Sequence, residues 1–230
     1  MAKILDGKHL LVLKPFARLV IEIHVSDQLT IGVLALQGDY DAHRETLSRL
    51  AVNSVLVRKP EELDDIDGLI IPGGESSTFL KFLEREGFLT KLRDFVAQKP
   101  AFGTCAGAIL LAKEVTNPKQ ESLGVLDIGI QRNAYGRQID SLIMTCPTSL
   151  DGEPMEMVFI RAPRIDRTGS GVEVLAERDQ HPVLVKQGKT LAATFHPELS
   201  ADTRVHELFL NMVREQKNSS DRTDSVKLEV

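Results

Sequence analysis

Cys105 is the residue whose type and surroundings point most directly to chemistry. It lies between Gly103 and Gly107, in a G-x-C-x-G pattern where a short apolar run meets a helix-like one. Glycines two positions to either side relieve crowding at a sharp strand-to-helix turn, so the side chain between them can project from the sheet. A thiol there also lies at a helix N-terminus, which favours the thiolate. The pattern predicts a nucleophile, but a buried cysteine beside packing glycines fits an isolated G-x-C-x-G about equally well.

A histidine followed by a carboxylate shifts the balance toward catalysis. His196, Pro197 and Glu198 follow the apolar run of residues 190–195. Proline biases the residue before it toward extended geometry, in which side chains two positions apart point the same way. Glu198 would then hold the imidazole of His196 in the tautomer that accepts the proton of Cys105. The other histidines fit structural positions in helical patterns, a loop or the N-terminal region: His9, His24, His43, His181 and His206.

A third element is the glycine pair in "PGGESST", residues 72–78. Gly73 and Gly74 follow a buried-strand run and can turn backbone N–H groups toward a site. With the N–H of Ala106, the N–H of Gly74 would form an oxyanion hole. The same glycines also fit a turn into a helix capped by Ser76 or Ser77, and both interpretations can hold together. A G-x-S-x-G motif and the glycine-rich phosphate motifs are missing from the sequence, so we expect neither a serine hydrolase nor a nucleotide cofactor.

The elements around these residues alternate in an α/β rhythm. Strand-like runs at residues 30–36, 53–58, 67–74 and 100–104 are separated by helical spacing at 40–51, 79–86, 88–98 and 105–115. We therefore predict a three-layer α/β fold of flavodoxin-like type, with a mostly parallel central sheet and helices on both faces. Ligands then bind at the carboxyl ends of the strands.

Short strand-like pieces follow Pro118, and we expect them to add to the sheet in antiparallel fashion. The last helix is predicted over 201–216, with Ser200 or Asp202 as its cap. The domain division is an N-terminal extension of unknown role at 1–29, one catalytic domain at 30–216 and a polar tail at 217–230.

Composition bounds the class of protein. The chain has 230 residues, 42% of them hydrophobic, and a formal net charge of −5 without a long basic block, which argues against nucleic acid as a partner. Its two cysteines, Cys105 and Cys146, predict neither a disulfide framework nor a metal cluster. Charged residues interrupt the apolar patches of the N-terminal region, so we expect no signal peptide, no membrane association and a cytoplasmic location.

Six segments make the chain similar to the class I, triad-type glutamine amidotransferases, and within them to the PdxT/SNO family of pyridoxal phosphate synthase glutaminases. The match spans almost all of residues 30–215. The segments are "IGVLALQGDYDAH" (31–43), "GLIIPGGESST" (68–78), "FGTCAGAILLA" (102–112), "RNAYGRQIDS" (132–141), "FIRAP" (159–163) and "TFHPEL" (194–199). The second, fourth and fifth are the most specific, because the cysteine turn is shared by many amidotransferases.

The resemblance implies that Cys105 attacks the side-chain amide of glutamine, that His196 moves the proton and that Glu198 orients His196. It also implies a partner, the barrel-shaped synthase subunit that uses the ammonia to make pyridoxal 5'-phosphate, and a glutaminase that is poorly active until docked. No cofactor or metal is implied. The implied glutamine-binding residues are Gly73, Gly74, Glu75, Arg132, Ile160 and Arg161.

Three alternatives remain open at this point. One is the glutaminase subunit of another amidotransferase. The second is a γ-glutamyl hydrolase or cysteine peptidase on a similar fold. The third is a scaffold subunit with a dead site, which the complete set of Cys105, His196 and Glu198 disfavours.

Overall fold

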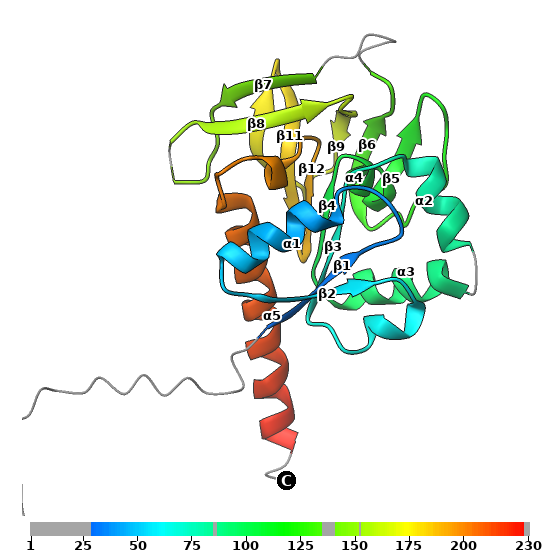
Figure 1. Cartoon of the computed structure of the whole chain (residues 1–230), viewed down its shortest axis with the longest axis vertical. Coiled ribbons are helices and arrows are strands. Elements are labelled where there is room, and N and C mark those ends of the chain that lie inside the picture. Colours follow the sequence, from blue (N-terminus) through cyan, green and yellow to red (C-terminus); the bar gives the residue numbers. More distant parts are fainter. Residues whose placement is uncertain (1–28, 85–86, 135–140, 152, 228–230) are drawn as a thin grey trace, which may run out of the picture.

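A seven-stranded sheet forms the centre of the molecule (Figure 1). The computed structural model describes residues 29–84, 87–134, 141–151 and 153–227, so the predicted N-terminal extension lies outside the described residues except for Leu29. The strand order is β10-β11-β12-β4-β3-β1-β2. Five neighbouring strands are parallel: β12 (Thr190–Ala193), β4 (Ala101–Thr104), β3 (Gly68–Ile71), β1 (Thr30–Leu34) and β2 (Asn53–Val57). The other two pair antiparallel at one edge: β11 (His181–Gln187) and β10 (Glu173–Arg178).

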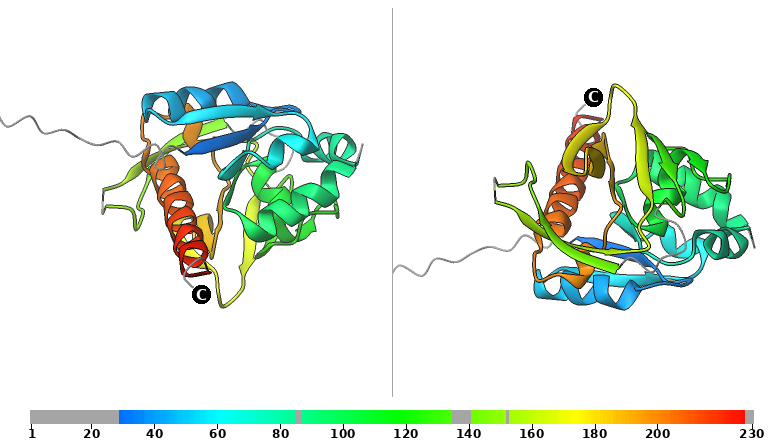
Figure 2. Two further views of the ribbon diagram at one scale, coloured as in Figure 1. Left: turned by 90° about the horizontal axis from the view of Figure 1, so that it is seen from below. Right: turned by 90° about the horizontal axis from the view of Figure 1, so that it is seen from above.

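Helices cover both faces of this sheet, as predicted, and Figure 2 shows the resulting layers. Side chains alternate between two apolar clusters because successive residues of a strand point to opposite faces. Ile70 of β3 packs in the cluster that contains Leu47 and Phe209, whereas its neighbour Leu69 packs with Phe79. The first cluster lies under α1 (Tyr40–Arg49) and α5 (Arg204–Lys227), and the second under α2 (Ser76–Leu83), α3 (Phe88–Gln98) and α4 (Ala106–Leu111).

The helix predicted over residues 105–115 is wrong in its second half. α4 ends at Leu111, and β5 (Ala112–Thr116) begins directly after it. Ala, Lys and Glu favour helices, but Lys113 and Glu114 are exposed while Ala112 and Val115 are buried, and the segment pairs with β6. Tertiary pairing therefore overrides local propensity here.

Among the described residues, β10 and β11 are the expected antiparallel additions to the sheet, whereas the expectation is wrong for β12, which joins the sheet parallel to β4. β6 (Leu126–Gln131) pairs with β5 and with β9 (Arg164–Thr168) in a separate three-stranded sheet. The sequence did not predict the strand β9. β7 (Ser141–Cys146) and β8 (Met155–Ile160) form a two-stranded antiparallel ribbon. A strand pattern shows that a segment is extended, but it does not say which strand will pair with it.

The last helix extends further than expected. α5 runs to Lys227, whereas the sequence predicted an end near residue 216, so most of the predicted tail is helical. The prediction of Ser200 or Asp202 as the cap is wrong, because Thr203 is the residue before α5 and its carbonyl oxygen accepts the first intrahelical hydrogen bond, from Glu207. Asp202 lies one position earlier, and its carboxylate accepts the backbone N–H of Arg204. None of the described helices is long and apolar enough to cross a membrane.

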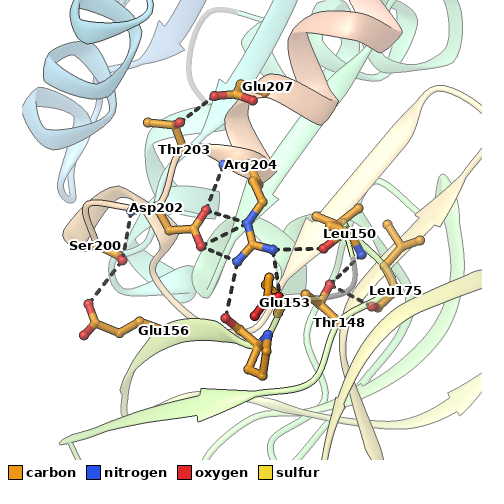
Figure 3. A network of polar contacts seen from close by, with 11 residues as sticks. Thr148, Leu150, Glu153, Glu156, Leu175, Ser200, Asp202, Thr203, Arg204 and Glu207 are labelled. Carbon is orange, nitrogen blue, oxygen red and sulfur yellow. Dashed lines mark hydrogen bonds and ion pairs between the residues drawn. The ribbon is translucent and has the colours of Figure 1, made fainter.

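Arg204 ties the start of α5 to the turn between β7 and β8 (Figure 3). Its guanidinium forms an ion pair with Asp202 at 2.6 Å and donates to the carbonyl oxygens of Leu150, Glu153 and Pro154. One side chain thus holds together two segments about fifty residues apart. The short 3₁₀ turn η4 (Pro197–Leu199), which contains Glu198, precedes this junction.

Candidate active site

Cys105 occupies the sharp turn between β4 and α4. Its φ of 47° and ψ of −102° lie in a region that L-residues rarely adopt. A β-carbon on Gly103 would lie 2.5 Å from the carbonyl carbon of Gly107, and one on Gly107 would lie 2.0 Å from the carbonyl oxygen of Ile71. Both glycines are therefore needed for the strand and helix to approach closely enough to form the turn.

His196 and Glu198 lie at the carboxyl end of β12, the strand beside β4. Nδ1 of His196 is 2.7 Å from Oε1 of Glu198, and both residues are buried. Sequence reasoning placed the pair in extended geometry, but Glu198 lies in the 3₁₀ turn η4. The proline that follows His196 begins this turn, and the turn brings the carboxylate back to the imidazole.

The electrostatics couple these groups. Burial acts to lower the pKa of His196, but hydrogen bonds to the side chains of Cys105 and Glu198 outweigh it and raise the pKa to about 10. Burial acts to raise the pKa of Glu198, but the facing imidazoles of His43 and His196 lower it. The arrangement thus favours a carboxylate and an imidazolium side by side.

The glycine loop after β3 packs on the imidazole. A β-carbon on Gly73 would lie 2.4 Å from Cε1 of His196. Gly74 has a φ of 151°, within the range that favours glycine. Ala106 is the first residue of α4, so its N–H belongs to the helix N-terminus beside Cys105.

The loop after β1 clamps the glycine loop. Nε2 of Gln37 donates to the carbonyl oxygen of Glu75 at 2.6 Å, and a β-carbon on Gly38 would lie 1.8 Å from the carbonyl oxygen of Gly73. Sequence reasoning did not select Gln37 or Gly38 as site residues. The available signal was their place directly after β1, the parallel neighbour of β3.

An open cavity lies above Cys105 at the carboxyl ends of the strands. Most of the predicted glutamine-binding residues line it, together with four residues that we did not select: Ser76, Ile109, Asn133 and Pro163. The predicted residues on its wall are Gly74, Glu75, Cys105, Arg132, Ile160 and Arg161. Ser76 directly follows Glu75, and Asn133 directly follows Arg132. Their position next to a predicted charged site residue was the signal in the sequence that could have identified them.

Glu75 carries the negative charge of this cavity. Its carboxylate caps α2 by accepting the N–H groups of Ser77 and Thr78, and it forms an ion pair with Arg132 at 3.1 Å. Burial acts to raise its pKa, but the hydrogen bonds from Ser77 and Thr78 lower it to about 2. Glu75 is therefore ionised at neutral pH.

Comparison with known proteins agrees with this geometry. A family described as the SNO glutamine amidotransferase family matches residues 33–215. The chain belongs to this family. The matched region includes Cys105 as well as the pair of His196 and Glu198.

Curated relatives support the assignment to the SNO family. A protein of Koribacter versatilis named pyridoxal 5'-phosphate synthase subunit PdxT is 68% identical over 186 residues, which cover 81% of this chain and 96% of the relative. A protein of the same name from Solibacter usitatus is 53% identical and covers 79% of this chain and 97% of its own length. The residues before Leu29 have no part in the family match.

Solved structures show the same fold. A crystal structure of a glutamine amidotransferase superposes with a TM-score of 0.75 at 48% identity and covers 80% of this chain and 98% of its own. A GMP synthase component from Thermoplasma acidophilum superposes with a TM-score of 0.61 at 16% identity, covering 86% of this chain and 98% of its own. The second likeness concerns the fold alone. The class I glutamine amidotransferase fold predicted from the sequence is therefore confirmed.

Proposed function

We propose that this protein hydrolyses L-glutamine to L-glutamate and ammonia through a thioester on Cys105, and that the ammonia serves a synthase partner that makes pyridoxal 5'-phosphate. The observation that carries the proposal is the connection of three groups at the cavity wall. Cys105 lines the cavity from a strained turn, its side chain is hydrogen-bonded to His196, and Nδ1 of His196 is 2.7 Å from Oε1 of Glu198. The proposal also rests on the family to which the chain belongs.

The chemistry follows from the two nitrogens of His196. Nδ1 faces Glu198, so Nε2 is the nitrogen left to take the proton of Cys105. The sulfur attacks the side-chain amide carbon of glutamine, and the N–H groups of Gly74 and Ala106 donate to the oxygen that becomes negative. His196 then gives the proton to the leaving nitrogen as the C–N bond breaks, which releases ammonia and leaves a γ-glutamyl thioester.

Water completes the cycle. His196 accepts a proton from the water as it attacks the thioester carbonyl, the same N–H groups hold the oxyanion, and the C–S bond breaks to release glutamate. The sulfur leaves as a thiolate beside the imidazolium of His196. The raised pKa of His196 suits this step because the imidazolium is stabilised beside the returning thiolate.

Binding of a free amino acid needs charges of both signs. Ionised Glu75 supplies an anion for the ammonium group of glutamine, and Arg132 and Arg161 supply cations at the same cavity for its α-carboxylate. The backbone at Ile160 closes the wall above the sulfur, with its carbonyl oxygen 4.0 Å from Sγ of Cys105.

The partner that we infer is the barrel-shaped synthase subunit. The relatives from Koribacter versatilis and Solibacter usitatus are named as subunits of pyridoxal 5'-phosphate synthase. We assign the same assembly to this chain, as a hetero-oligomer in which the synthase consumes the ammonia. The clamp that Gln37 places on the loop at Glu75 is a contact through which docking would act on the oxyanion turn.

The test is glutamate release from glutamine by the purified chain, alone and mixed with a pyridoxal phosphate synthase barrel protein. We expect strong stimulation by the partner. High activity that does not change when the partner is added would support glutamine hydrolysis but would indicate that another synthase accepts the ammonia. No release in either mixture would refute glutamine hydrolysis.

Two variants test the assigned residues. Cys105→Ala should abolish glutamine hydrolysis without unfolding the chain, because it removes one thiol at the edge of the cavity. His196→Asn should lower kcat by about 100-fold to 10,000-fold, since it removes the general base. Near wild-type turnover in either folded variant would exclude that residue from the mechanism.

A further inference from the structure

A second imidazole lies behind the pair of His196 and Glu198. His43 of α1 is completely buried, and its Nε2 is 3.4 Å from Oε2 of Glu198, the carboxylate oxygen that does not face His196. The same nitrogen is 3.2 Å from Oγ1 of Thr104, the residue directly before Cys105. His43 therefore touches both the strand that ends at the nucleophile and the carboxylate that orients the base.

A third imidazole continues the line. Nε2 of His206, on α5, is 3.0 Å from Nδ1 of His43, and His206 is also completely buried. In the described part of the chain, Nδ1 of His206 and Oε2 of Glu198 have no hydrogen-bond partner, so His43 faces Oε2 of Glu198 at ion-pair distance rather than in hydrogen-bond geometry. Glu198, His43 and His206 thus form a chain of buried polar groups that runs away from the cavity, through three separate elements.

The contacts select one set of tautomers. A carboxylate only accepts hydrogen bonds, so the nitrogen of His43 that faces Glu198 should carry a proton. Nδ1 of His43 is then an acceptor, which requires Nε2 of His206 to donate to it. This leaves Nδ1 of His206 as an unprotonated, unpaired acceptor, which is less costly than an orphaned N–H. In the opposite set of tautomers, the unprotonated Nε2 of His43 would direct its lone pair at the carboxylate of Glu198, which is repulsive.

We propose that His43 is a positioning residue: its protonated Nε2, 3.4 Å from Oε2 of Glu198, attracts this oxygen so that Oε1 stays directed at His196, and His206 holds His43 in the required tautomer. The inference rests on the roles proposed above for Cys105, His196 and Glu198. It assigns the buried histidine of α1 a part in catalysis although it reaches neither the cavity nor the substrate.

The surroundings keep this chain of groups neutral apart from its carboxylate. Burial lowers the pKa of His43 against the opposing charge of Glu198, and His196 and Asp39 are the other titratable groups that act on it. On the α5 side, burial lowers the pKa of His206 to about 3 despite the opposing charge of Glu198, and Arg49 acts in the same direction as burial. A neutral donor holds the carboxylate without neutralising it, which leaves its full charge to act on His196.

The first test compares His43→Leu, His43→Gln and His43→Asn in the full chain with its synthase partner. The amide nitrogen of glutamine lies near the place of Nε2 of histidine, and that of asparagine near the place of Nδ1. We expect His43→Leu and His43→Asn to lower kcat for glutamine about tenfold or more at unchanged KM, because a buried polar contact with an ionised group is lost. His43→Gln should recover most of the activity.

The second readout is independent of turnover. The rate of alkylation of Cys105 by iodoacetamide is measured against pH, with Cys105→Ala as the blank and His181→Gln, at a half-buried position on the edge strand pair, as the control variant. Weaker support of Glu198 stabilises the imidazolium of His196 less, so the midpoint of the alkylation curve should rise by about one pH unit in His43→Leu. The midpoint of His43→Gln should stay close to that of the wild type.

The outcomes separate this inference from the proposed function. A folded His43→Leu with wild-type kcat and midpoint would overturn the role of His43 alone. If His43→Leu does not fold, wild-type behaviour of His43→Asn would overturn it. Glutamine turnover that survives Cys105→Ala would instead refute the thioester mechanism on which the inference rests.

Discussion

A β-carbon on Gly107 would lie 2.0 Å from the carbonyl oxygen of Ile71, the last residue of β3. The helix that follows the nucleophile is thus in backbone contact with the strand beside β4. This contact fixes the position of α4 against β3. The turn at Cys105, which joins β4 to α4, therefore keeps its strained geometry.

Gly107→Ala should therefore disable the site even though it changes no reacting atom. The obstacle is backbone rather than a flexible side chain, so we expect a loss of about 3 kcal/mol or more in the free energy of unfolding and loss of glutaminase activity. Urea unfolding and glutamate release measure the two effects. Gly171→Ala is the control, since its β-carbon would meet only the end of Gln187 at 3.3 Å. Equal stability of the two variants would show that the contact is not needed.

Glu75→Gln should weaken substrate binding more than the fold. The change removes the negative charge that pairs with Arg132 and faces the cavity, while an amide oxygen can still accept part of the cap of α2. We expect KM for glutamine to rise about tenfold and stability to fall by about 1 kcal/mol. The matched control is Glu121→Gln, which breaks an exposed ion pair with Arg93. An unchanged KM in Glu75→Gln would remove Glu75 from the glutamine site.

Arg204→Gln should loosen the junction drawn in Figure 3. The shorter glutamine side chain cannot reach Asp202 and the carbonyl oxygens of Leu150 and Glu153 at once. We therefore expect the free energy of unfolding to fall by about 2 kcal/mol. Hydrogen exchange should become faster in the turn between β7 and β8. Arg214→Gln, which loses one exposed contact to Asn211, is the control. Exchange that is no faster in that turn than in the control would contradict the prediction.

Stability should fall as the solution becomes acidic. The pKa of His206 is about 3 in the folded chain and near 6.5 when unfolded, so the unfolded chain binds more protons between these values. The stability from neutral His206 is therefore complete above pH 6.5 and is lost as the pH falls, by about 2 kcal/mol between pH 7 and pH 5. The lowered pKa of His43 adds to the loss.

His206→Leu tests this linkage. Urea unfolding at pH 7 and pH 5 should show a smaller loss in the variant than in the wild type. The contribution of His196, whose raised pKa acts in the opposite direction over this range, is common to both proteins. If both proteins lose the same free energy of unfolding between pH 7 and pH 5, His206 has a similar pKa in the folded and the unfolded chain, and the prediction is wrong.

Cys146→Ala should leave the chemistry intact. Cys146 is buried in the apolar cluster beside Met155, and burial raises the pKa of its thiol, which makes it a poor nucleophile. We expect the free energy of unfolding to fall by about 1 kcal/mol and glutamate release to stay unchanged. Loss of activity in a folded Cys146→Ala would mean that the wrong thiol was assigned.

The amino-acid sequence by itself determined the order of the elements as far as α4 and part of the set of residues that meet at the site. Apolar periodicity indicates whether a segment is a strand or a helix, and the glycines around Cys105 mark the turn because no other residue fits there. The pair of His196 and Glu198 was visible because its members are close in sequence. The motifs also sufficed for the family.

Other features depended on the tertiary structure. The helix-forming residues of β5 became a strand because β6 pairs with them, and Glu198 reached His196 through a 3₁₀ turn rather than an extended chain. His43 and His206 looked like ordinary helix residues because 163 positions separate them. Only the packing of α1 and α5 on one face of the sheet brings the two rings together behind Glu198. Local patterns record what a residue prefers, whereas burial and long-range contact decide what it touches.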